Sequence, residues 1–73
     1  MIPDAKTIGA RLKTLRGERS MQEIADVCGV SRQAYWKYEA GEIVPSDEVK
    51  QKIANFYGVN VGDIFFALED NNT

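Results

Sequence analysis

Residues 20–38 constrain the fold of this chain more than any other stretch, because they predict two short helices joined by a very short turn. Ser20 and Glu23 have the spacing of a capping box, in which each side chain bonds the backbone N–H of the other residue. Gly29 suits the left-handed conformation that ends a helix, and Ser31 is a favoured N-cap for the next helix. Two helices joined by so short a turn must cross at a steep angle. We therefore expect the chain to fold around this crossing pair.

Apolar residues recur with the helical period of 3.6 in three further segments, and no strand-like alternation persists. We expect helices over about 7–16, from about 21 to 28, over about 31–38, from Ser46 to Gly58, and a short one after Asn60, whose cap Asp63 supports. The residues expected to face inward are Ile8, Leu12, Leu15, Met21, Ile24, Ala25, Cys28, Val30, Ala34, Tyr35, Tyr38, Val49, Ile53, Phe56, Tyr57, Val61, Ile64, Phe65 and Leu68. The sequence thus predicts a compact, all-α, five-helix domain over residues 1–68 and a polar, disordered tail over 69–73.

Size and composition exclude several classes of protein. A chain of 73 residues has room for one small core. It contains no apolar run long enough to span a membrane, and its N-terminus lacks the features of a secretion signal, so we expect a cytoplasmic protein. Cys28 is the only cysteine and there is no histidine, which argues against a disulfide within the chain, a zinc site and histidine-based catalysis. We expect no metal and no cofactor, and an enzyme has little support because the chain also lacks a glycine-rich phosphate loop.

Charge is distributed unevenly along the chain, although the net charge is only −2. Residues 6–37 contain seven basic and three acidic residues, whereas residues 38–73 contain two basic and seven acidic residues. A basic half and an acidic half are compatible with one surface that faces phosphates and a rear that faces away. Mixed solvated faces also arise by chance, so the asymmetry adds only slight support.

Several short segments resemble the Cro and phage-repressor helix-turn-helix family, often called the Xre family, and the likeness covers about residues 7–66. The segments that carry it are Glu23-Ile24-Ala25, Gly29-Val30-Ser31, Tyr38-Glu39-Ala40-Gly41, Val44-Pro45-Ser46, Ile53-Ala54 and residues 58–65. The resemblance implies a lambda-repressor-like fold and a sequence-specific DNA-binding regulator, most commonly a repressor, whose third helix enters the major groove.

Residue roles follow from the same resemblance. It implies base contacts by Arg32, Gln33, Trp36 and Lys37, and their chemistry agrees: arginine binds guanine and glutamine binds adenine with two hydrogen bonds each, and an apolar ring packs on a thymine methyl. Expected phosphate contacts are Arg19, Ser20, Gln22 and Ser31. The positions of Arg16 and Glu39 match a structural ion pair that ties the first helix to the end of the recognition helix, so we expect both residues to be partly buried.

The chain departs from the family pattern at three places. The turn 17–19 is short, Met21 stands where relatives often have a phosphate-contacting glutamine, and Glu42 lies in a loop that is often basic. Each departure weakens the expected binding that is independent of DNA sequence.

Two classes of function remain open at this stage. In the first, the chain is a homodimeric regulator that binds a double-stranded operator with two half-sites, and Phe65, Phe66 and Leu68 supply the dimer surface. Packing of Phe66 on the first helix of its own domain is an equal alternative. In the second, the chain is the antitoxin of a toxin pair or an antagonist of a larger repressor, and DNA binding is secondary. The acidic half would then contact the partner protein.

Overall fold

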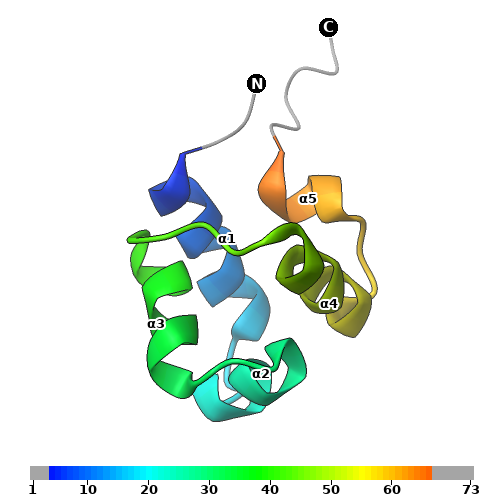
Figure 1. Ribbon diagram of the computed structural model, residues 1–73. Helices are drawn as coiled ribbons and strands as arrows, with labels where there is room; N and C mark the ends of the chain where they lie inside the picture. Colours follow the sequence, from blue (N-terminus) through cyan, green and yellow to red (C-terminus); the bar gives the residue numbers. More distant parts are fainter. Residues whose placement is uncertain (1–3, 67–73) are drawn as a thin grey trace, which may run out of the picture.

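The computed structural model describes residues 4–66, and every regular element in that range is an α-helix. The helices are α1 (Ala5–Arg16), α2 (Met21–Cys28), α3 (Arg32–Ala40), α4 (Asp47–Tyr57) and α5 (Val61–Phe65) (Figure 1). The predicted all-α, five-helix fold is confirmed. The predicted domain boundary at residue 68 and the tail 69–73 lie outside the described residues. None of the helices in the described range has the length and apolar character needed to cross a bilayer.

Capping side chains set the helix starts. The side-chain oxygens of Ser20, Ser31 and Ser46 each accept a hydrogen bond from the backbone N–H three residues later. Asp4 does the same for Thr7 at 2.8 Å, which is why α1 begins two residues earlier than the sequence pattern indicated. Of the capping box expected at the start of α2, the bond from Glu23 N–H to the Ser20 side chain forms, and the Glu23 carboxylate lies 3.9 Å from Arg19 Nε. A complete box forms at the start of α5.

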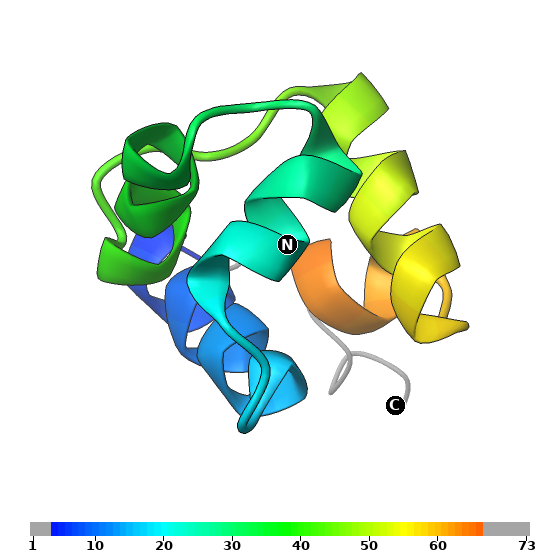
Figure 2. The same ribbon diagram turned by 90° about the horizontal axis from the view of Figure 1, so that it is seen from below.

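All five helices contribute to one core. The fully buried side chains include Leu12 of α1, Ile24 of α2, Tyr35 of α3, Ile53 of α4 and Phe65 of α5. Helices α3 and α4 lie on either side of α2, as the view in Figure 2 shows. Phe56 was expected in this core but is 38% exposed. Ala54 is buried on α4 instead, because the neighbouring helices pack on its side of the stripe formed by Val49 and Ile53.

Gly9 lies where α1 crosses the C-terminal end of α3, and it allows an unusually close approach. A Cβ atom added at Gly9 would overlap the Glu39 carbonyl oxygen and would lie 2.8 Å from the Tyr38 carbonyl oxygen. These neighbours are backbone atoms of a packed helix, which cannot rotate away as a side chain can. The crossing of α1 and α3 therefore depends on glycine at this position.

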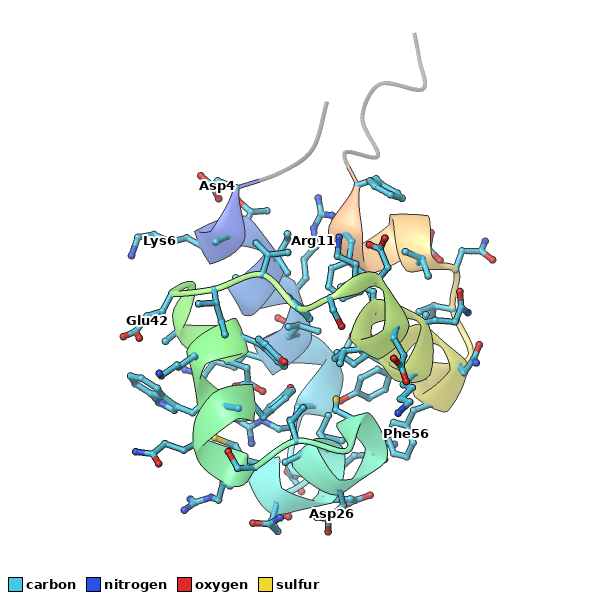
Figure 3. The ribbon with its side chains drawn as sticks, viewed as in Figure 1. Asp4, Lys6, Arg11, Asp26, Glu42 and Phe56 are labelled. Carbon is cyan, nitrogen blue, oxygen red and sulfur yellow. The ribbon has the colours of Figure 1, made fainter. Side chains whose placement is uncertain are left out.

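Arg11 joins α1 to the C-terminal end of α5. Its Nη1 donates to the carbonyl oxygens of Ile64, at 2.9 Å, and Phe66, at 2.8 Å. Figure 3 shows the Arg11 side chain reaching from α1 toward α5. A cation that bonds the last carbonyls of a helix satisfies acceptors that have no partner within the helix. Arg11 thus holds a helix of only five residues in place.

Candidate nucleic-acid interface

Helices α2 and α3 form a tight helix-turn-helix unit. Gly29 adopts a left-handed conformation, with φ of 74°, and Val30 N–H donates to the Ala25 carbonyl at 3.1 Å. Ala25 is fully buried, and its short side chain lets the two helices approach each other closely. These features fix the direction in which α3 leaves the turn.

One face of α3 is buried and the other is free. Tyr35 and Tyr38 point into the core, whereas Arg32, Gln33, Trp36 and Lys37 are exposed. Trp36 keeps 45% of its surface exposed, which is a large apolar area for a surface residue. The helical period alone therefore sorts α3 into an inner and an outer face. The four residues expected to contact bases all lie on the outer face.

Part of this outer face borders a hollow between the start of α2 and the first half of α3. Its lining residues are Met21, Ser31, Arg32, Gln33 and Trp36. Met21 was expected on the apolar stripe of the second helix; it is half-buried, and it also forms one wall of this hollow. The hollow brings together two side chains with polar ends, a serine hydroxyl and two apolar walls.

The expected phosphate-contacting residues are less uniformly placed. The Ser20 and Ser31 hydroxyl oxygens accept their capping bonds, and each hydroxyl still has a proton to donate to a phosphate. Gln22 already donates from Nε2 to the Asp26 carboxylate at 2.8 Å; Asp26 points outward at the α2 end of the molecule in Figure 3. The Arg19 guanidinium lies over the Phe56 ring at 5.5 Å, which directs it toward α4. Ser31 alone among these residues borders the hollow.

Behind α3, a buried ion pair connects it to α1. Arg16 Nε and Nη2 donate to the two carboxylate oxygens of Glu39 at 2.7 and 3.0 Å, and the Tyr35 hydroxyl donates to the same carboxylate at 2.6 Å. The Glu39 side chain is 4% exposed and that of Arg16 is 15% exposed. The bond to Glu39 raises the pKa of Arg16, and burial together with Glu39 raises the pKa of Tyr35. Arg16 is therefore charged, Tyr35 is neutral, and both serve as donors to Glu39.

Comparison with known proteins assigns most of the described domain to a family. The profile of a helix-turn-helix domain family matches residues 7–64. The chain belongs to this helix-turn-helix family. Its members are DNA-binding transcriptional regulators and not enzymes. The family assignment made from short sequence segments is thus confirmed, and so is the expectation that the chain is not an enzyme.

Two curated helix-turn-helix relatives come from phage or prophage genes. The cryptic phage CTXphi transcriptional repressor RstR of Vibrio cholerae is 34% identical over 64 residues, covering 85% of this chain and 58% of RstR. The SPbeta prophage-derived uncharacterized HTH-type transcriptional regulator YonR of Bacillus subtilis is 41% identical over 54 residues, covering 71% of this chain and 50% of YonR. The chain thus matches 58% of the length of RstR and half of the length of YonR.

A solved structure shows the same helix-turn-helix fold. The solution structure of the SOS-response transcriptional repressor LexA from Eubacterium rectale has a TM-score of 0.78, at 23% identity, covering 100% of this chain and 81% of that chain. At this level of identity the likeness concerns the arrangement of helices and not the residues that contact a ligand.

The dimer surface expected for a helix-turn-helix regulator needs correction. Phe65 is fully buried in the core of its own domain, so it offers nothing to a second copy. Phe66 is 44% exposed, and Leu68 lies outside the described residues. The sequence pattern assigned Phe65 both to the core stripe and to the dimer surface, and burial leaves only the first role.

Proposed function

We propose that the chain is a sequence-specific regulator that binds double-stranded DNA and represses transcription, with the first half of α3 in the major groove. The observation that carries this proposal is the free outer face of α3, where Arg32, Gln33, Trp36 and Lys37 stand exposed on a helix that is fixed from behind. The name of RstR, a transcriptional repressor, supports repression as the outcome. Such a regulator acts where the DNA is, which agrees with the cytoplasmic location expected from the sequence.

The chemistry of the outer face suits base readout. Arg32 can donate two hydrogen bonds to O6 and N7 of guanine, and Gln33 can pair its amide with N6 and N7 of adenine. Lys37 lies one turn further along α3, and its long side chain can donate to a base or a phosphate. The Ser20 and Ser31 hydroxyls, together with the free amides at the starts of α2 and α3, supply uncharged phosphate contacts.

Homodimerisation is part of this proposal. A single small domain makes few base contacts, and two copies on a symmetric operator double them. Phe66 is the described residue that best supports a dimer surface, because it is a large apolar side chain exposed beside the end of α5. The interface then lies near α5, away from the helix-turn-helix unit.

Selection from a random duplex library tests the proposed function. We expect the purified protein, at about physiological salt, to retain a two-fold symmetric site with half-site centres about 10 to 11 base pairs apart. Recovery of no common sequence by a protein shown to be folded would contradict the proposal. The alternative, an antitoxin or repressor antagonist that mainly binds another protein, would then be favoured.

Arg32→Ala should weaken binding to the selected operator about 10- to 100-fold and relax the preference at one base pair, because a good bidentate contact is worth about 1–3 kcal/mol. Lys6→Ala is the matched control, since Lys6 is also exposed and cationic but points outward near Glu42, away from the α2 end of the molecule (Figure 3). Fluorescence anisotropy with the operator and with single-base variants measures both effects. If both variants lost the same operator affinity and kept the same base preference, Arg32 would contribute only its charge.

Phe66→Asp should convert a dimer into a monomer and weaken binding to the full operator at least about tenfold, because a charge replaces the apolar contact. Ile43→Asp is the control, since Ile43 is equally exposed, at 44%, but lies in the loop between α3 and α4. Sedimentation velocity gives the oligomeric state of each variant. If Ile43→Asp disrupts the dimer and Phe66→Asp does not, the interface lies at that loop instead of α5.

A further inference from the structure

The hollow between α2 and α3 combines apolar walls with a polar rim. Met21 and Trp36 supply the apolar walls, and Arg32, Gln33 and Ser31 supply the rim. Among these lining residues there is one cation and no acidic side chain, so the rim is compatible with the electronegative edge of a base pair. The hollow is therefore suited to an apolar group that projects from a polar, electron-rich surface.

The position of Trp36 on α3 narrows the choice of that group. Trp36 lies three residues after Gln33 and four after Arg32, so the three side chains occupy neighbouring positions on one helix face. The indole ring of Trp36 therefore lies beside the bases that Arg32 and Gln33 would contact. In the major groove, the apolar group that projects from a base edge is the methyl group on C5 of thymine. Cytosine carries the same group at the same place when it is methylated at C5.

We propose that this hollow receives the 5-methyl group of a pyrimidine next to the bases contacted by Arg32 and Gln33, so that Met21 and Trp36 determine part of the operator sequence. The inference rests on the proposed function and adds a determinant of specificity to it. Met21 contributes from α2, so the readout does not belong to α3 alone.

The test uses the operator recovered by selection and changes one methyl group at a time. Each thymine is replaced in turn by deoxyuridine, which removes the methyl group and leaves every hydrogen-bonding group in place. We expect about fourfold weaker binding at one position of each half-site, the effect of burying about one methyl group. A cytosine·guanine pair at that position tests whether the hollow recognises the methyl group itself. The protein should bind an operator with 5-methylcytosine there about fourfold more tightly than one with unmethylated cytosine. If methylation of cytosine strengthens binding but replacement of thymine by deoxyuridine has no effect, the methyl group in the hollow belongs to 5-methylcytosine.

Substitutions in the two walls connect the effect to the hollow. Trp36→Ala and Met21→Ala should bring the ratio of thymine to deoxyuridine affinity close to one, whereas Lys6→Ala should keep the full ratio. Circular dichroism verifies that each variant is folded. If the operator is bound but no methyl group matters, or if the ratio persists in both wall variants, this inference is wrong and the proposed function stands. If selection recovers no operator, both fall together.

Discussion

Gly9→Ala should destabilise the domain by about 3 kcal/mol, the upper part of the range for overpacking a well-packed site. Intrinsic helix propensity alone predicts the opposite, a gain of about 1 kcal/mol from alanine in the middle of a helix. Packing decides the sign, because the new Cβ would overlap the Glu39 carbonyl oxygen and lie 2.9 Å from the Glu39 carbonyl carbon. Helix α1 would have to move away from α3 to make room.

Gly62→Ala is the matched control for this prediction. Gly62 also lies within a helix, and a Cβ there would meet Phe66 Cδ2 at 3.5 Å, an ordinary contact. Alanine at Gly62 should therefore be neutral or stabilising by up to about 1 kcal/mol. Thermal and urea unfolding followed by circular dichroism measure both variants, and the melting temperature of Gly9→Ala should fall by roughly 15 °C. A Gly9→Ala variant as stable as the wild type would show that α1 and α3 do not cross this closely.

Glu39→Ala should also cost about 3 kcal/mol, because it removes the acceptor shared by Arg16 and Tyr35. The Tyr35 hydroxyl would lose its acceptor, and the Arg16 guanidinium would keep only the bond from Nη1 to the Arg19 carbonyl oxygen. The cost lies at the lower end of the range for breaking a buried ion pair, since Arg16 is 15% exposed and can partly recover hydration. Operator affinity should fall as well, because α3 would lose its connection to α1 behind the outer face.

Two further substitutions make the Glu39 experiment specific. Glu23→Ala removes a carboxylate that is 51% exposed and 3.9 Å from Arg19, and it should change stability by no more than about 0.5 kcal/mol. Glu39→Gln keeps the shape and one acceptor oxygen, so its cost should lie between the two alanine variants. Chemical unfolding measured in parallel gives the three values. Similar values for Glu39→Ala and Glu23→Ala would mean that the buried pair does not stabilise the fold.

The parts of the fold that could be predicted from the sequence are those that neighbouring residues determine. Serine caps and Gly29 placed the helix ends because a cap bonds a backbone group only three residues away. The inner and outer faces of α3 could also be predicted, because the helical period relates residues only three or four positions apart. The burial of Phe56 and Ala54 was harder to predict. Both lie near the edge of one apolar stripe, and only the packing of α4 decides which of them is buried.

Features that join distant parts of the chain could not be predicted in this way. Arg11 bonds a carbonyl 53 residues away, and nothing in its neighbourhood along the sequence indicates that partner. The contact of the Arg19 guanidinium with the Phe56 and Tyr57 rings is another such feature, and the expected phosphate contact of Arg19 stays a prediction. Gly9 did leave a signal, since a glycine inside an amphipathic helix often marks a close backbone approach. That signal does not say which helix approaches.

The Arg11 contact also determines how this domain can be joined to other proteins. The described chain enters at Asp4 and leaves after α5, and both points lie at the end of the molecule opposite α2 (Figures 1 and 3). Since Arg11 bonds the Ile64 and Phe66 carbonyls from α1, the point at which the described chain ends is held against α1. A reporter or an enzyme attached at either point would therefore start at the end of the molecule opposite α2. Such an addition would share this end of the molecule with Phe66 and would leave α2 uncovered.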